Sequence, residues 1–499
     1  MANPLLRTKS VEQSIADTEV VGTRLKKQLT AWDLTIFGVA VVVGAGIFTI
    51  GASTAGDFSG PAVSISFVIA AIACGLAALC YAEFASTVPV AGSAYTFSYA
   101  TFGEFAAWII GWDLVLEFSI AAAAVASGWS SYLGTVFGTG PAAFQVSGYT
   151  VDWGAMLIVG VLTVLLTFGA KVSSRVSAVI TAIKVAVVLL VIVVGAFYIK
   201  GSNYSPFVPA SVPGESTDVS WATTLFQAIS GGSGSTYGWY GVLAGAGIVF
   251  FAFIGFDIVA TSAEETVNPQ RDVPRGILGS LAIVTVLYIA VTVVVTGMAS
   301  YKDLATSAGN GKEKNLAYAF SLNGVDWAAT IISIGALAGL TTVVMVLLMG
   351  QNRVLFAMAR DGLLPRKLAK TSHRGVPVRI SVGVGVVVAV FAGLVPLSEL
   401  ASLINIGTLF AFVLVSVGVV VLRKQRPDLK RGFTAPLVPL VPILSVIACG
   451  WLMLNLSLET WFRFVCWMAL GVIVYFIYSK NHSVLGMRER GEKVESLAD

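Results

Sequence analysis

The stretch VVVGAGIFTIGA at residues 41–52 is apolar enough for a bilayer-spanning helix, yet GAG at residues 44–46 interrupts it near its middle. Each glycine in a helix interior costs roughly 1 kcal/mol relative to alanine. Unwinding a membrane helix also frees N–H and C=O groups, which is tolerated only where they line a cavity or meet a ligand. The interruption therefore indicates a binding site, unless the glycines only allow neighbouring helices to pack closely.

The composition of the whole chain is that of a membrane protein. Only 12% of the 499 residues are charged, and the mean hydropathy is +0.85. Runs of about 20 apolar residues, the length that crosses the hydrocarbon core, recur along the chain. They predict an all-α polytopic membrane protein with about twelve transmembrane helices. The expected spans are 32–56, 61–86, 104–134, 152–170, 176–199, 241–266, 276–299, 326–350, 379–396, 400–422, 435–455 and 460–478.

The basic residues are divided unevenly between the predicted loops. Of the 31 Lys and Arg residues, 25 fall on one side of the membrane and four on the other. Cytosolic loops carry such an excess, so we expect a plasma-membrane protein with cytosolic tails at 1–30 and 479–499. The first thirty residues contain no apolar core, so no cleaved signal peptide is expected. Orientation alone explains the basic loops, and no nucleic-acid partner is expected.

A second apolar run, GIVFFAFIGFDIVATSAEET at 247–266, is also interrupted, around IGF at 254–256 with Asp257 just after. Five predicted spans separate the starts of the two broken helices, so the two halves of the chain run through the membrane in opposite directions. Glycine breaks at matching places in inverted halves point to a transporter site. We predict broken first and sixth helices, with a first repeat at 31–200, a second at 241–423 and two further helices within 434–478.

The two breaks offer partial charges of opposite sign. Free amides at the start of a half-helix carry about +0.5 of a charge, and free carbonyls at its end about −0.5. An amino acid zwitterion has one charged group for each, so we expect amides after the first break to hold a carboxylate and carbonyls at both breaks to hold an ammonium. The predicted substrate-binding positions at the breaks are Val42, Gly44, Ala45, Gly46, Ile47, Phe251, Ala252 and Ile254.

Four strings of residues carry a family resemblance: GAGIF at 44–48, PVAGSAYTFSYATFGE at 89–104, FIGFDIVATSAEETVNPQRDVPRGI at 253–277 and NRVLFAMARDGLLP at 352–365. They resemble the amino acid–polyamine–organocation (APC) superfamily of transporters, and within it the bacterial members of the cationic amino acid transporter family. The resemblance covers roughly residues 25–480. It implies a five-plus-five inverted repeat, two further helices and alternating access. Animal members usually have fourteen spans, so about twelve fits a prokaryotic relative.

Lys184 stands inside a predicted span, where a charge is costly and therefore informative. Its ammonium either snorkels to the inner interface or lies against carbonyls freed by the first break. Sodium-coupled members of this fold hold a sodium ion at that place, and the resemblance implies that a lysine supplies the charge instead. Burial makes it easier for a lysine to lose its proton, so we predict proton coupling through Lys184 and no cofactor.

Carboxylates and two apolar side chains complete the predicted site. Glu117 in the third span either binds the amino end or side chain of a substrate or bonds to neighbouring helices, and Asp113 lies one turn earlier on the same face. Ser119 is expected to add a hydroxyl to the same region. Asp257 either orients the unwound backbone or takes part in proton movement. By resemblance, Phe251 closes over the substrate and Met345 shapes the side-chain pocket, although lone apolar side chains in helices usually only pack.

These features predict a secondary transporter that imports L-amino acids with protons. The expected substrates are cationic amino acids such as arginine and lysine, small neutral ones such as alanine, or both. A sodium symporter or an exchanger is the alternative within this class. An enzyme has little chemistry available, since the chain holds two histidines and no HExxH, GxSxG or P-loop motif. A channel would need rings of charge or filter carbonyls.

The remaining expectations concern partners and pairing. The four cysteines fall within spans without metal-ligand spacing, so no metal site is expected. Glu264 and Glu265 are expected to pair with Arg271 or Arg275. The predicted partners are the substrate and the lipid bilayer, and the protein is expected to be a monomer. A small single-span accessory membrane protein is left open.

Overall fold

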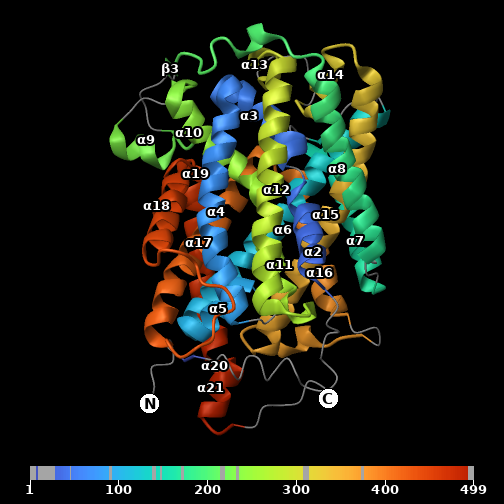
Figure 1. Cartoon of the computed structure of the whole chain (residues 1–499). Helices are drawn as coiled ribbons and strands as arrows, with labels where there is room; N and C mark the ends of the chain where they lie inside the picture. The colour runs from blue at the N-terminus through green and yellow to red at the C-terminus, as the bar shows by residue number, and fades with distance from the viewer. Residues whose placement is uncertain are drawn as a thin grey trace.

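The computed structural model describes residues 7–8, 29–44, 46–88, 93–137, 142–146, 149–169, 174–213, 220–231, 235–306, 314–372 and 376–492. Its long helices run side by side along one axis (Figure 1). Eight helical stretches in this part of the chain are long and apolar enough to cross a membrane, and three shorter apolar helices accompany them. The first of the eight, Ala31–Thr87, covers two predicted spans. All twelve predicted segments are therefore helical, and the all-α fold class is confirmed.

The first half of the chain supplies five spans. The first, broken span consists of α2 (Ala31–Val42), the π-helix η2 (Gly46–Ile50), α3 (Gly51–Thr54) and a second π-helix, η3 (Ala55–Ser59). After the short turn η4 (Gly60–Ala62) come α4 (Val63–Thr87), the connecting helix α5 (Ser93–Thr101), α6 (Glu104–Phe137), α7 (Trp153–Thr167) and α8 (Ser174–Ala196). A two-stranded antiparallel hairpin, β1 (Ala143–Val146) and β2 (Tyr149–Asp152), joins α6 to α7.

The second half repeats this order. Its broken span consists of α10 (Gly238–Val249), the 3-10 helix η6 (Phe250–Phe253) and α11 (Ile258–Thr261). There follow α12 (Pro269–Met298), α15 (Asp326–Arg360), α16 (Val378–Leu394) and α17 (Leu397–Gln425). Two further spans are α18 (Leu440–Leu454) and α19 (Leu458–Val474), the latter prolonged by η9 (Tyr475–Ser479), α20 (Lys480–His482) and α21 (Val484–Glu489).

Smaller elements complete the connections between spans. They are η5 (Gly201–Tyr204), the paired strands β3 (Val212–Pro213) and β4 (Ser235–Thr236), α9 (Leu225–Ser230), η7 (Ala263–Glu265), α13 (Tyr301–Leu304), α14 (Leu316–Ser321) and η8 (Arg366–Ala369).

Several helices extend beyond their apolar runs. α12 begins at Pro269, seven residues before the predicted span, because Pro is well suited to the first turn of a helix. α15 continues to Arg360, ten residues past the predicted end. At the start of α2, Thr30 and Asp33 form a capping box, in which Thr30 N donates to the Asp33 carboxylate at 2.9 Å. Hydropathy thus located the spans, and capping chemistry decided where the helices begin.

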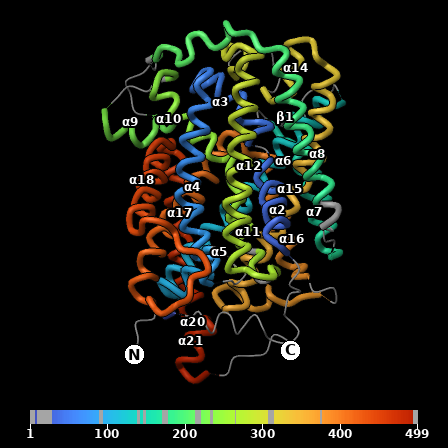
Figure 2. Tube along the Cα trace, in the orientation of Figure 1, coloured from blue at the N-terminus to red at the C-terminus, as the bar shows by residue number. Residues whose placement is uncertain are grey.

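Several contacts between a helix of the first half and a helix of the second half have a counterpart between the corresponding helices. α2 packs on α12, and its counterpart α10 packs on α4. α6 packs on α17, and its counterpart α15 packs on α8. The two third helices, α6 and α15, pack on one another. These contacts have the internal symmetry of an inverted repeat, and Figure 2 shows α4, α12 and α2 side by side along the bundle.

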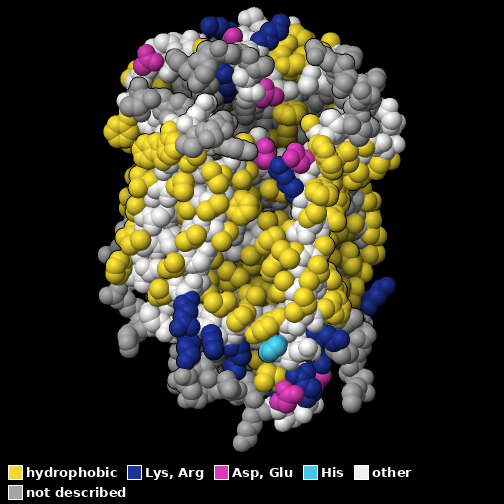
Figure 3. Space-filling model, turned by 180° about the vertical axis from the view of Figure 1, so that it is seen from behind, with side chains coloured by type: hydrophobic (Ala, Val, Ile, Leu, Met, Phe, Trp, Pro, Cys, Tyr) yellow, Lys and Arg dark blue, Asp and Glu magenta, His cyan; other side chains and the backbone are white. Residues whose placement is uncertain are grey.

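The surface of the bundle suits a lipid environment. Hydrophobic side chains cover the middle of the face shown in Figure 3, and Lys and Arg side chains lie toward its two ends. Large apolar residues such as Val286, Val386 and Ile447 are at least 60% exposed. Arg7 Nε lies 2.9 Å from Glu489 Oε2, which places segments from the two ends of the chain at the same end of the bundle. The chain is a multi-pass membrane protein.

An ion-pair network ties the second span to the tenth. Glu83 of α4 is 3% exposed and accepts hydrogen bonds from Arg423 Nε at 2.7 Å and Nη2 at 2.6 Å. The Ala435 amide donates to the same carboxylate at 2.7 Å, and Arg431 Nε lies 3.5 Å from it. One buried carboxylate therefore holds three separate segments together.

We expect Glu83→Gln to lower the free energy of unfolding by about 2 kcal/mol, because loss of the carboxylate leaves Arg423 and Arg431 without their counter-charge. The melting temperature of the purified protein in detergent measures this effect. Asp428→Asn is the control, since it removes an exposed ion pair with Arg426 and is expected to leave the melting temperature unchanged. Equal melting temperatures for Glu83→Gln and the parent protein would contradict the prediction.

Candidate functional site

Both broken helices are interrupted where the sequence predicts. α2 ends at Val42, and η2 begins at Gly46; Ala45, a predicted site residue, lies outside the described residues. In the second broken span, η6 ends at Phe253 and α11 begins at Ile258. Between them Gly255 has a φ of 115°, a conformation that glycine adopts without steric cost.

The two breaks lie directly against each other. A Cβ added at Gly46 would lie 2.2 Å from Ala252 Cα, and one added at Gly255 would lie 2.7 Å from Val41 Cγ1. A Cβ at Gly44 would meet its nearest neighbour, Val343 of α15, at an ordinary 3.5 Å. Gly46 and Gly255 therefore allow the two broken spans to pack closely at the breaks, and a binding role for the breaks stays a prediction.

Side chains from distant helices bind the backbone carbonyls at the first break. The last carbonyls of a helix have no partner within it. The Tyr288 hydroxyl of α12 donates to Val42 O at 2.6 Å. On the other side of the break, the Tyr132 hydroxyl of α6 donates to Phe48 O at 2.5 Å. A carbonyl oxygen has two lone pairs, so Val42 retains one for a further donor.

Lys184 of α8 lies at the first break, as predicted. Its side chain is 1% exposed, which excludes snorkelling to an interface. Its Nζ donates to Ala40 O at 2.6 Å, one of the carbonyls at the end of α2. The aliphatic stem lies against α15 at Gly339, where an added Cβ would meet Lys184 Cγ at 2.8 Å. The Lys184 side chain is thus held between α2, the first half of the first broken span, and α15, the eighth span.

Three buried carboxyl groups form a second cluster, which we call the acidic group: Asp113 and Glu117 of α6 and Asp257 beside the second break. Each is at most 1% exposed. Both carboxylate oxygens of Asp113 and of Glu117, and Oδ1 of Asp257, make no hydrogen bond within the described part of the chain. Glu117 is close enough to Asp113 and Asp257 for electrostatic interaction with both. Buried carboxylates in this state need a proton or a cation.

The tenth span also borders the acidic group, a contribution that the sequence analysis missed. A Cβ added at Gly407 of α17 would lie 2.9 Å from Asp113 Oδ1. The hydroxyl-bearing side chain of Thr408 lies beside Glu117. No local signal marks these two residues, because a Gly-Thr pair in an apolar helix is ordinary in sequence. Their role follows only from the packing of α17 on α6.

Two predicted residues stand on other helix faces than these groups. Ser119 is 7% exposed, but two residues along a helix turn it roughly 200° from Glu117, so helical spacing does not bring its hydroxyl to the acidic group. Met345 is also buried, six residues beyond Gly339 and therefore roughly 240° around α15 from the face that holds Lys184. Its place in a side-chain pocket stays a prediction.

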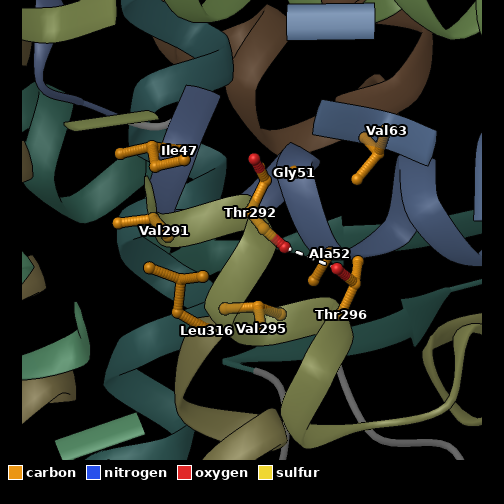
Figure 4. A pocket seen from close by; sticks show the side chains of 9 residues that line it. All are labelled: Ile47, Gly51, Ala52, Val63, Val291, Thr292, Val295, Thr296 and Leu316. Carbon is orange, nitrogen blue, oxygen red and sulfur yellow. Dashed lines mark hydrogen bonds between the residues drawn. The ribbon is translucent and has the colours of Figure 1, made fainter. Parts of the chain in front are cut away.

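The apolar residues at the breaks are all buried. Phe251 and Ala252 lie in η6, and Ile254 follows it, with exposed fractions of at most 9%. The side chain of Ile47 instead faces a narrow cleft between the first broken helix and α12, shown in Figure 4. In this cleft the Thr296 hydroxyl donates to Thr292 O at 2.7 Å, and the space is too narrow for a water molecule. Ile47 can therefore contribute its amide to a substrate site, while its side chain packs elsewhere.

The sequence of this chain is similar to those of known transporters. The family model described as amino acid permease matches residues 29–478, which include both breaks, Lys184 and the acidic group. The branched-chain amino acid permease of Bacillus subtilis (strain 168) is 43% identical over 498 residues, covering 97% of this chain and 100% of the relative. The methylthioribose transporter of the same organism is 42% identical over 491 residues, covering 96% and 99%. The vacuolar cationic amino acid transporter 4 of Arabidopsis thaliana is 36% identical over 444 residues, covering 85% and 68%.

Proposed function

This chain belongs to the amino acid permease family of the APC superfamily, and from that premise we propose that it imports L-amino acids together with protons by alternating access. Its relatives are transporters and permeases, so it is a transporter and not an enzyme. We place it in the plasma membrane with both termini in the cytosol. One chain supplies both breaks, Lys184 and the acidic group, so a monomer suffices.

The single observation that supports proton coupling is the bond from Lys184 Nζ to Ala40 O. A hydrogen bond from an ammonium is roughly twice as strong as one from a neutral amine. Loss of the proton therefore loosens the hold of α8 on the inner half of the first broken helix. Movement of that half-helix opens the inner side in our proposal, so proton release and substrate release occur together.

The substrate's two charged groups are assigned to the backbone at the breaks. In our proposal the amides of Gly44, Ala45, Gly46 and Ile47 bind the carboxylate, since free amides at a half-helix start attract anions. The carbonyls of Val42, Phe251 and Ile254 bind the ammonium, with Ala252 bringing the two breaks into contact. Glu117 adds a negative charge near the ammonium, and Asp257 takes part in proton movement.

In our proposal the site recognises the side chain of the substrate less strictly than its two charged groups. Phe251, Ile254 and Met345 are apolar, which favours neutral side chains from alanine up to the branched-chain amino acids. Two relatives are named branched-chain amino acid permeases, at 43% and 34% identity. The acidic group favours arginine and lysine as a second substrate class, and relatives named cationic amino acid transporters support it. The neutral and the cationic amino acids share the α-amino acid frame, and both classes are taken up by a carrier in this proposal.

Uptake into proteoliposomes tests the proposal. A gradient of one pH unit, acidic outside, corresponds to about 1.4 kcal/mol per proton and is expected to accumulate a co-transported neutral amino acid about tenfold. The panel contains alanine, leucine, isoleucine, arginine, lysine and methylthioribose, which lacks the amino acid frame and is expected to be excluded. Uptake driven by a sodium gradient would replace the proton symporter by a sodium symporter. Counterflow without net uptake would replace it by an exchanger. Non-saturable flux or chemical conversion of the substrate would contradict a carrier altogether.

A further inference from the structure

An open apolar groove runs along the outside of the bundle between α4 and α12, which lie next to each other in Figure 1. Its volume is about 340 Å³. From α4 it is lined by Val68, Ala71 and Ile72, of which Ile72 is 58% exposed. Gly75 lies one turn further along α4, and an added Cβ there would meet nothing within 4 Å, so space is open at that level too.

The α12 side of the groove is one continuous stripe. Leu278, Ala282, Thr285 and Ile289 line it and follow one another at three- and four-residue spacing, which places them on one helix face. The Thr285 hydroxyl donates to the carbonyl of Leu281 at 2.8 Å, so its polar group is satisfied within the helix. The groove therefore presents hydrocarbon to its surroundings along its length.

Two arginines continue this stripe at the N-terminal end of α12. Arg275 precedes Leu278 by three residues and Arg271 by seven, so both share its face. Arg275 is exposed, and the Arg271 side chain is 67% exposed, with its Nε only loosely paired to Asp272 at 3.9 Å. The sequence predicts that Glu264 and Glu265 pair with these arginines. For Glu265 this is wrong, since its carboxylate lies 3.3 Å from Arg353 Nη2 instead, and the side chain of Glu264 lies outside the described residues.

The length of the stripe matches one leaflet of a bilayer. From Arg275 to Ile289 the helix rises roughly 21 Å, and from Leu278 to Ile289 roughly 16 Å. Half of the hydrocarbon core is about 15 Å. Arginine side chains on a helix point toward its N-terminus, so these two extend toward the headgroup region and away from the groove.

We propose that this groove binds an acyl chain of an anionic phospholipid whose phosphate is held by Arg271 and Arg275. The apolar stripe accounts for the chain and the exposed guanidinium groups account for the phosphate, as arginine binds phosphate oxygens in a bidentate manner. α4 packs on α10, and α12 packs on α2, so the lipid contacts the two helices that pack directly on the two broken spans. Lipid composition would thereby act on the helices that move during transport.

Native mass spectrometry of the purified protein tests this, with dioleoyl phosphatidylglycerol and dioleoyl phosphatidylcholine as probes. The parent protein is expected to retain the anionic lipid more tightly. The double variant Arg271→Gln/Arg275→Gln is expected to weaken that binding by roughly fivefold for each arginine, and to leave phosphatidylcholine binding unchanged. Lys424→Gln, which removes an exposed basic residue from α17, is the charge control and is expected to behave like the parent.

A second variant tests the acyl-chain part separately. Gly75→Leu places a side chain in the open space beside the groove and is expected to weaken the binding of both lipids several-fold. Gly383→Leu is the control, because it fills equally open space on α16. Ala282→Phe repeats the test from α12 if Gly75→Leu lowers the melting temperature. Unchanged phosphatidylglycerol binding in the arginine variant would overturn the phosphate site, and unchanged binding in both filled variants would overturn the groove. If the parent protein formed dimers and the filled variants did not, the groove would be assigned to a second copy of the chain instead. None of these readouts depends on transport.

Discussion

Lys184→Ala is expected to abolish proton-driven accumulation while leaving the protein inserted and folded. The variant removes the group that, in our proposal, gains and loses the proton, together with the donor to Ala40 O. Accumulation under a one-unit pH gradient is expected to fall from about tenfold to none. Counterflow of substrate, which needs no proton, is expected to persist. Both are measured in the same proteoliposomes with radiolabelled substrate.

Two further variants separate proton exchange from simple capping of α2. Tyr288→Phe removes the donor to Val42 O, 2.6 Å away, but leaves the amine in place, so proton-driven uptake is expected to weaken and remain. Lys184→Arg keeps a positive charge that does not release its proton, and it is expected to fail like alanine. Undiminished proton-driven uptake by Lys184→Ala would reject the role of this residue, with no effect on the lipid-binding proposal.

Gly46→Ala is expected to disrupt the site more than any other single methyl group. Its Cβ would lie 2.2 Å from Ala252 Cα and 2.9 Å from Ala252 N, and backbone atoms cannot move aside as a flexible side chain can. Overpacking of this kind costs about 1–3 kcal/mol or more. We expect a lower melting temperature and at least tenfold slower uptake, because separation of the breaks by about 1 Å misplaces the groups that we propose bind the substrate.

Gly44→Ala is the matched control for this prediction. The two glycines are two residues apart in the same break, but a Cβ at Gly44 meets its nearest neighbour at 3.5 Å. This variant is therefore expected to keep the melting temperature of the parent protein. If both variants melted alike, close backbone contact between Gly46 and Ala252 would not be what holds the breaks together.

The fold was predictable from the sequence because the membrane imposes local rules. A span needs about 20 apolar residues, and a charge within it is costly. Such rules located the twelve helical segments, both breaks and Lys184 without any knowledge of packing. Helix ends were less predictable: α12 and α15 extend beyond their apolar runs, since helical propensity continues where the bilayer ends.

The site was predictable only in part. The sequence indicated that carbonyls at the first break need partners. Because a lysine within a span is conspicuous, Lys184 was predicted either to snorkel to an interface or to lie against these carbonyls, and the structure shows the second. Tyr288 and Tyr132 were missed, as were Gly407 and Thr408, since tyrosine, glycine and threonine are common in apolar helices. Helical spacing turns Ser119 to a different face of α6 from Glu117.

The sequence by itself determined that this chain crosses a membrane many times, that two of its helices are broken, and that buried charges accompany the breaks. Only the tertiary structure decided which donor meets which carbonyl and which carboxylates share one place. Lys184 and Ala40 are 144 residues apart in the chain, and Tyr288 and Val42 are 246 apart. Hydropathy and propensity act over a few residues, whereas these contacts depend on how whole helices pack, and packing is decided by shape across the entire bundle.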